Sequence, residues 1–265
     1  MSGFYIGVDG KAKKVKGVYI GVDGVARKVK KGYIGNENGV ARLCYLDNPY
    51  DPVFANNSWE DVIAACQTGS VPDSWNVGDQ MTMTIDGADY AVDIIGKNHD
   101  DYADGSGKAP LTFQLHECYN AKYVMDSYGE NTSGWNDCAI RVTHLPTVLA
   151  KMPSEVRGAI RDVVKLTSVG NSETTIESAN DKLFLLSEIE FFGALKYSAP
   201  GEGEQYQYYV NGGHTIKRCN GSVALHIERS PRKDTYNRYC AVSTSGTAST
   251  CEPQYESAIS PAFCF

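Results

Sequence analysis

The clearest pattern of apolar and polar positions lies in the first 45 residues, where one short unit occurs three times. The segment GFYIGVDG at residues 3–10 returns as GVYIGVDG at 17–24 and, altered, as GYIGNENG at 32–39. Each copy predicts a strand, an Asp-Gly or Asn-Gly turn and a return strand, because these dipeptides adopt the positive φ angles of a two-residue type I′ hairpin. The return strands at 11–16 and 25–30 alternate small or apolar with basic side chains, so one face of each hairpin is expected to meet water.

Hairpins of this size bury little surface and are marginally stable in water by themselves. We therefore expect residues 1–46 to form a basic hairpin module that associates with copies of itself or docks on a larger assembly. A flexible basic tail is the alternative interpretation of the same segment.

A turn-rich stretch at residues 47–56, containing Asp47-Asn48-Pro49-Tyr50-Asp51-Pro52, predicts a linker to a second domain at 57–265. That domain is expected to open with a helix, since Ser58-Trp59-Glu60-Asp61 resembles a capping box and Gly69 ends the apolar pattern of Ile63, Ala64 and Cys66. Asp86-Gly87 between residues 81–85 and 90–95 predicts another hairpin.

The rest of the second domain mixes short helices with irregular strands. Residues 145–149 and 156–164 predict helices separated by Pro153, residues 183–186 predict a buried strand, and the chain from Gly201 onward predicts turns and short strands. The apolar residues of 259–265 are expected to be core. Together these elements predict an α+β fold.

Composition and charge separate the two parts of the chain further. The 265 residues are 42% hydrophobic and 22% charged, as in core-forming proteins, and no apolar run approaches the length of a membrane span or resembles a signal peptide. Residues 1–45 carry nine basic and three acidic residues, so the net charge of −7 combines +6 there with −13 in the other 220 residues. The basic part lacks the interleaved aromatic residues of a nucleic-acid platform. We therefore expect no nucleic-acid partner and no membrane insertion.

Residues that often carry chemistry are present but scattered. The eight cysteines include no C-x-x-C pair, which argues against zinc and redox motifs and favours buried reduced thiols. Asn98-His99-Asp100-Asp101 has the groups of a metal or acid–base site, although a structural hydrogen-bond network is the preferred interpretation. Ser187-Glu188 with Glu190 lacks a nucleophile elbow, and the glycines at 201, 203, 212 and 213 suit turns. His116, His144, His214 and His226 stand alone, so we predict no catalytic set, metal site or cofactor.

The C-terminal part has the composition of a binding surface. Tyr236, Tyr239 and Tyr255 lie among Ser243, Thr244, Ser245 and Thr247, and tyrosines with small polar neighbours are typical of paratopes. An ordinary polar loop is the alternative.

Five motifs in order resemble a family of phage and prophage domains that are often variable proteins of diversity-generating retroelements. The resemblance covers residues 57–265 and rests on Trp75-Asn76-Val77-Gly78-Asp79, Ile94-Ile95-Gly96-Lys97-Asn98-His99-Asp100-Asp101, Asp181-Lys182-Leu183-Phe184-Leu185-Leu186-Ser187-Glu188, Arg229-Ser230-Pro231 and Ser260-Pro261-Ala262-Phe263-Cys264. The repeats of the first 45 residues are similar to those found ahead of this domain in phage tail proteins.

The resemblance implies a C-type-lectin-like fold, related to formylglycine-generating enzymes, that displays a hypervariable surface. It implies a receptor-binding protein of the phage tail tip, made in the bacterial cytoplasm, with a host-surface protein or glycan and tail components as partners. Self-association as a homotrimer is expected by analogy with phage fibre tips.

The residues themselves fit such diversification. Mutation of the adenines of an AAC codon cannot produce Lys, Glu, Gln, Met or Trp, and residues 234–250 contain none of these five. Family members often have tryptophans before Arg-Ser-Pro, where this chain has His226 and Ile227, both reachable from AAC. We therefore expect an exposed, variable ligand-binding set made of His226, Ile227, Asp234, Thr235, Tyr236, Asn237, Arg238, Tyr239, Ser243, Thr244, Ser245, Thr247, Ser249, Thr250 and Tyr255.

A second function stays open at this point. An enzyme of the formylglycine-generating type would need reactive cysteines together in a cleft, and Cys240, Cys251 and Cys264 are the C-terminal candidates. We favour the non-enzymatic adhesin.

Overall fold

The structure is a computed structural model that describes residues 5–15, 17–29, 31–35, 41–46 and 50–265. Its contacts divide the chain into two compact units, residues 1–75 and 76–265. Each unit is described here by itself, and the predicted linker at 47–56 stays a prediction, with residues 47–49 outside the described part.

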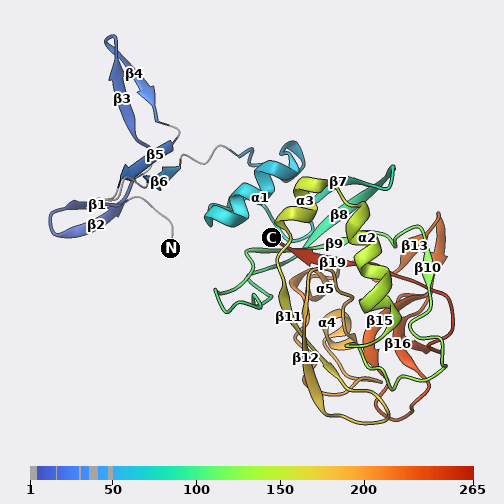
Figure 1. The fold of residues 1–265 in the computed structure, drawn as a ribbon. Helices are drawn as coiled ribbons and strands as arrows, with labels where there is room; N and C mark the ends of the chain where they lie inside the picture. The colour runs from blue at the N-terminus through green and yellow to red at the C-terminus, as the bar shows by residue number, and fades with distance from the viewer. Residues whose placement is uncertain (1–4, 16, 30, 36–40, 47–49) are drawn as a thin grey trace. The chain divides into compact units, whose positions relative to one another are not determined.

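The first unit contains three hairpins, as the repeats predicted (Figure 1). They pair β1 (Tyr5–Val8) with β2 (Lys11–Lys14), β3 (Tyr19–Val22) with β4 (Val25–Lys28), and β5 (Lys31–Gly35) with β6 (Ala41–Leu46). Asp9 and Asp23 have φ of 51°, and Gly10 and Gly24 have φ of 72° and 77°, as a type I′ turn requires. The third turn falls on residues 36–40, outside the described residues.

The first unit also contains a short 3-10 turn, η1 (Phe54–Asn56), and helix α1 (Trp59–Thr68). The predicted capping box is confirmed, because Ser58 and Asp61 exchange side-chain and backbone hydrogen bonds, and Gly69 ends the helix in the left-handed conformation. Phe54 is buried against Trp75, with ring centroids 5.2 Å apart. This part of the predicted linker is therefore packed within the first unit.

The second unit contains a four-stranded antiparallel sheet in the order β19-β9-β8-β7. Its strands are β7 (Gln80–Ile85), β8 (Ala88–Lys97), β9 (Leu111–Leu115) and β19 (Ala262–Cys264). The β7–β8 hairpin turns at Asp86-Gly87, as predicted. Phe263 is fully buried and stacks on Phe113 at 5.4 Å, so the expectation that the C-terminus is core is confirmed.

A five-stranded sheet in the order β10-β18-β15-β16-β17 carries the C-terminal part of the chain. Its strands are β10 (Lys122–Tyr123), β15 (His226–Pro231), β16 (Tyr239–Val242), β17 (Ala248–Cys251) and β18 (Ser257–Ala258). Strands β15 and β18 are parallel, whereas the other pairs are antiparallel. Strand β15 lies in the middle of the sheet, with β18 on one side and β16 on the other.

Smaller elements complete the second unit. Two hairpins pair β11 (Val163–Ser168) with β12 (Ile176–Asp181) and β13 (Lys217–Cys219) with β14 (Ser222–Ala224). The helical segments are the π-helix η2 (Ile140–His144), α2 (Leu145–Lys151), α3 (Ser154–Ala159), α4 (Glu188–Phe192) and α5 (Gln207–Val210). Within the described residues, no helix is both long and apolar enough to cross a membrane.

Two predicted elements differ from the structure. The helix expected at 156–164 ends at Ala159, because Val163 and Val164 pair with β12 as the start of β11. Residues 183–186 are buried as expected, but they form only an isolated bridge from Phe184 to Ala262 rather than a strand. The predicted α+β class is confirmed.

Candidate functional site

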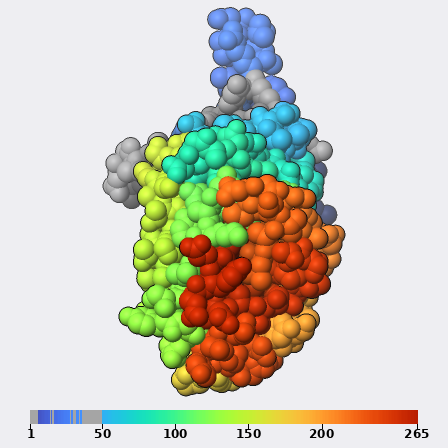
Figure 2. All heavy atoms as spheres, turned by 90° about the vertical axis from the view of Figure 1, so that its right-hand side faces the viewer, coloured from blue at the N-terminus to red at the C-terminus, as the bar shows by residue number. Residues whose placement is uncertain are grey.

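The exposed part of the predicted ligand-binding set lies on three segments of the C-terminal region: the loop at 232–238, the β16–β17 turn at 243–247 and the loop at 252–256. We call these segments the C-terminal face. In Figure 2 the orange-to-red end of the chain covers the centre of one side of the second unit, beside a green segment from the middle of the chain. The predicted residues that are exposed are Asp234, Tyr236, Thr244, Ser245, Thr247 and Tyr255; those that are half-buried are Thr235, Asn237, Arg238, Ser243, Ser249 and Thr250.

Three members of the predicted set are buried, and the expectation that they are displayed is wrong. His226 and Ile227 lie on β15, which is covered on both edges by β16 and β18 and packs against α4, where the Phe191 ring lies 5.6 Å from the His226 ring. Tyr239 on β16 is fully buried, and its hydroxyl donates a hydrogen bond to the Gly134 carbonyl at 2.7 Å. A strand that is buried on both faces has no displayed side.

The loop at 232–238 is held by a buried asparagine from elsewhere in the chain. The side-chain Nδ2 of Asn131 donates to the carbonyl oxygens of Thr235 at 2.8 Å and Arg238 at 2.7 Å, and its backbone N–H donates to the Tyr236 carbonyl. Its Oδ1 accepts from the Asn171 backbone N–H at 2.8 Å, which fixes the orientation of the amide. All contacts of Asn131 with this loop therefore reach backbone atoms, which every residue type supplies.

The β16–β17 turn is held through backbone atoms and through hydrogen bonds among its own hydroxyl groups. Ser243 N–H donates to the Thr247 carbonyl, and Gly246, with φ of 77°, closes the turn by donating to the Ser243 carbonyl. The Thr215 hydroxyl donates to the Gly246 carbonyl at 2.7 Å from outside the turn. The positive φ makes glycine the favoured residue at 246, and the hydroxyl of Ser245 hydrogen-bonds those of Ser243 and Thr247.

The loop at 252–256 is also held by hydrogen bonds to its backbone. The buried Pro253 offers its carbonyl to the N–H groups of Met125 and Asp126 at 2.8 and 3.1 Å, while Tyr255 remains 59% exposed. An Arg238–Glu252 ion pair at 3.2 Å connects this loop with the first one. The three segments thus present Tyr236, Tyr255 and Arg238 to solvent from a backbone that is fixed by its surroundings.

A buried network of charged groups joins Arg229 on β15 to Asp100, which belongs to the predicted Asn98–Asp101 cluster. The Arg229 guanidinium donates to both carboxylate oxygens of Glu190 and to the carbonyls of Leu166, Leu185 and Glu202. Lys165 bridges Glu190 at 2.8 Å and Asp100 at 2.7 Å. Arg229, Glu190, Lys165 and Asp100 are all buried, whereas Asn98 and Asp101 of the predicted cluster are exposed.

The ionisation of this network follows from its pairing. Burial opposes the charge on Asp100, but the Lys165 ammonium and hydrogen bonds from Lys165 and Thr112 outweigh it and lower the pKa of Asp100 to about 2. Glu190 shows the same balance between burial and its two cationic neighbours, and its pKa is also lowered. Glu228 next to Arg229 behaves differently, because burial and the neighbouring Glu188 and Glu202 raise its pKa.

The seven cysteines whose side chains the structure describes are buried free thiols. Burial raises the pKa of Cys66, Cys118 and Cys138 to about 12 and that of Cys251 to about 11, so these thiols stay protonated at neutral pH. A surface pocket of about 430 Å³ is lined by no cysteine; its residues are Ala103, Asp104, Ile160, Arg161, Asp162, Asn180 and Lys182. The reduced-thiol prediction is confirmed for these seven.

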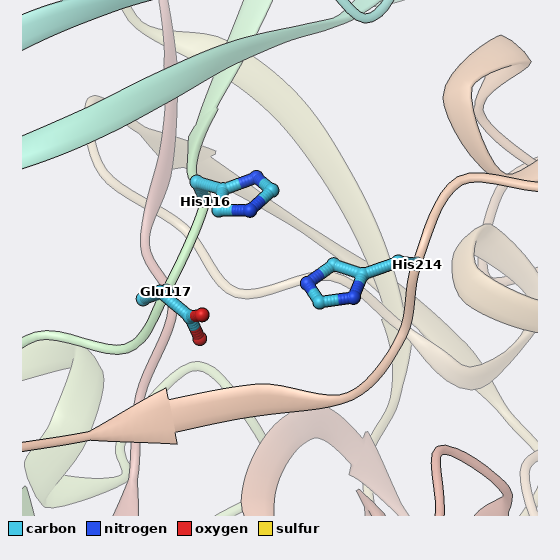
Figure 3. Close-up of side chains that lie close together, drawn as sticks. All are labelled: His116, Glu117 and His214. Atoms are coloured by element: carbon cyan, nitrogen blue, oxygen red, sulfur yellow. The ribbon is translucent and has the colours of Figure 1, made fainter. Parts of the chain in front are cut away.

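Two histidines that appear isolated in the sequence meet in space. His116 and Glu117 follow β9, and His214 precedes β13; their ligand atoms lie within 4.8 Å of one another (Figure 3). The prediction that these histidines stand alone is wrong, because the fold brings together two residues that are 98 positions apart in the chain. Only the adjacency of His116 and Glu117 is visible in the sequence.

One family model, described as "Domain of unknown function (DUF6273)", matches residues 111–265, more than half of the chain. The match includes the C-terminal face, Asn131 and the His116–Glu117–His214 group. The comparisons with curated proteins and with solved structures gave no match.

Proposed function

Since the chain belongs to the DUF6273 family, whose name assigns no activity, we propose from its geometry that it is a non-enzymatic ligand-binding protein that uses the C-terminal face. The single observation that carries this proposal is the way Asn131 holds the loop at 232–238. Because its hydrogen bonds reach only backbone carbonyls, the loop keeps its shape while its side chains change. A binding surface whose specificity varies within a constant fold needs this arrangement.

The side chains on the C-terminal face suit macromolecular or glycan ligands. Tyr236 and Tyr255 are 54% and 59% exposed, and Arg238 lies between the two loops that carry them. Tyrosine and arginine supply a large share of the contact energy at interfaces, and small polar neighbours such as Thr244 and Ser245 adapt to the partner. The ligand that we propose is a protein or glycan of a host-cell surface.

We further propose that the protein is a phage tail-associated variable protein of a diversity-generating retroelement with a C-type-lectin-like fold. The five sequence motifs support this, as does the absence of Lys, Glu, Gln, Met and Trp from residues 234–250. Within that run the four residues of β16 are buried, so diversification there would be limited to the loop and turn on either side.

Assembly is proposed to reside in the hairpins of the first unit. Ile6, Tyr19, Ile20, Val25 and Tyr33 are each at least half exposed, which is unfavourable for an isolated module and favours association with a second copy. A homotrimer attached to tail components is the assembly that we propose. The buried, protonated thiols favour this binding function over cysteine-dependent catalysis.

Binding of the purified full chain to intact cells of candidate bacterial hosts tests the proposal. Tyr236→Ala and Tyr255→Ala are each expected to weaken attachment by about 1 kcal/mol or more, because each removes a large exposed ring. Val53→Ala, which trims a side chain that is 55% exposed outside the hairpins and outside the C-terminal face, is the control and should leave attachment unchanged. Attachment that survives the Tyr236→Ala, Tyr255→Ala double variant would refute a ligand site on the C-terminal face.

A further inference from the structure

The side chains of His116, Glu117 and His214 form a group whose possible ligand atoms face one another. Figure 3 shows the Glu117 carboxylate and the two imidazole rings turned toward a common space from two separate segments. The rings of His116 and His214 lie nearly parallel, with centroids 4.9 Å apart. None of these three side chains is needed to fill the core, because all are half-buried or exposed.

His116 is oriented by a buried carboxylate. Its Nδ1 lies 2.8 Å from Oδ2 of Asp93, which is 1% exposed and also accepts a hydrogen bond from Gln80 at 2.6 Å. Gln80 Nε2 lies 2.9 Å from the same Nδ1, and of these two neighbours the carboxylate favours the tautomer with the hydrogen on Nδ1, which leaves a lone pair on Nε2. This carboxylate–imidazole arrangement is the one that supports histidine ligands in metal sites.

Two glycines bring His214 back toward β9. Gly212 has φ of 81°, and a Cβ on Gly213 would lie 2.3 Å from the Tyr208 ring, so the chain passes closer to that ring than other residues allow. The Gly213 N–H donates to the Tyr208 carbonyl at 2.8 Å and ends this tight turn. The His214 side chain that follows is exposed and stacks on the His116 ring.

More negative than positive charges lie near His116, Glu117 and His214, which favours the binding of a cation. Glu117 and Asp93 contribute two carboxylates, whereas Lys217 is the nearby cation and donates to the carbonyls of Leu115 and His116 at 2.7 Å each. One Glu117 oxygen accepts from the Arg218 backbone N–H, so the other is available.

We propose that His116, Glu117 and His214 bind one divalent transition-metal ion, for which zinc is the best match. Two imidazole nitrogens and one carboxylate oxygen form a donor set typical of zinc, whereas calcium and magnesium prefer oxygen alone. Bonds of about 2.1 Å in a tetrahedron place ligand atoms about 3.4 Å apart, so atoms that now lie within 4.8 Å must close by up to about 1.4 Å. Rotation of His214 provides most of that movement, and water fills the fourth position.

The ion would fasten the segment at 211–216 to the end of β9. Thr215 follows His214 directly and holds Gly246 of the C-terminal face. Metal binding is therefore expected to slow amide exchange in residues 211–216 and in the β16–β17 turn. The site itself does not depend on the proposed ligand-binding function, and its test uses no host ligand.

Calorimetric titration of the chelator-treated full chain with zinc chloride tests the site, with cobalt(II) absorption as a second readout. The wild-type chain is expected to bind one equivalent, to show the visible bands of four-coordinate cobalt and to unfold at a higher temperature with zinc. His214→Ala and Glu117→Gln should abolish saturable binding. His144→Ala removes a histidine that stacks on Tyr123 elsewhere, and should bind zinc as the wild type does.

Asp93→Asn provides a graded outcome, since loss of the supporting carboxylate should weaken zinc binding by roughly 10- to 100-fold. Circular dichroism of each apo variant establishes that it is folded before titration. A wild-type chain that binds no zinc, or a folded His214→Ala variant that binds it with unchanged affinity, would overturn the proposal.

Discussion

At the scale of single residues, the structure separates side chains that hold the C-terminal region from side chains that it exposes. Asn131 is fully buried and uses its amide to hold a loop more than 100 residues away, yet nothing in the sequence around it indicates this role. Tyr236 and Tyr255 were predictable as exposed because they lie among small polar residues. Tyr239 was not, because a tyrosine followed by Cys-Ala-Val fits a buried strand as well as a variable segment.

His226 leads to a prediction about pH at this scale. Burial lowers its pKa to about 3, whereas the unfolded chain takes up a proton near the ordinary value of 6.5. The unfolded state therefore binds more protons between these values, and the stability contributed by neutral His226 is present above pH 6.5 and is lost as the pH falls toward 3.

We expect the free energy of unfolding of the wild type, relative to His226→Gln, to fall by up to about 1.4 kcal/mol for each pH unit in that window. Urea unfolding of both proteins from pH 7 to pH 4 measures this difference, and the contributions of Asp100 and Glu190 cancel because both proteins contain them. Parallel stability curves would show that His226 is not held neutral by burial.

At the scale of elements, turn and capping residues were sufficient to predict those hairpins and the helix that they fix locally. The Asp-Gly turns and the Ser58 capping box fix their hairpins and helix through contacts only a few residues apart. The end of α3 at Ala159 was missed, because Val163 and Val164 are apolar in either conformation and only pairing with β12 selects the strand. The His116–Glu117–His214 group depends entirely on such long-range pairing.

At this scale we predict that the hairpin module determines the oligomeric state of the protein. Because its exposed apolar side chains are proposed to pack against other copies, deletion of residues 1–45 should convert an oligomer, a trimer in our proposal, into a folded monomer. Sedimentation equilibrium of the full and truncated chains measures this, and circular dichroism checks that the remaining domain is folded. The same oligomer before and after deletion would place assembly elsewhere in the chain.

At the scale of the whole molecule, a charged network and a sheet support a face whose side chains take little part in stability. Arg229, Glu190 and Lys165 are buried, and the C-terminal residue Phe265 packs into the core with Phe113. The sequence predicted this core and the α+β class from its apolar runs. It did not predict which polar residues lie inside, because buried ion pairs require partners that are distant in the chain.

The central claim is that the C-terminal face consists of replaceable side chains on a backbone held from outside. Its most direct test is the free energy of unfolding of two variants of the full chain. The first combines Tyr236→Ser, Thr244→Asn, Ser245→Asn and Tyr255→Ser, and should stay within about 1 kcal/mol of the wild type because exposed substitutions have small effects. The second, Asn131→Ala, should lose about 2 kcal/mol or more because it leaves partly buried carbonyls without donors. A fourfold variant that is less stable than Asn131→Ala would contradict the claim.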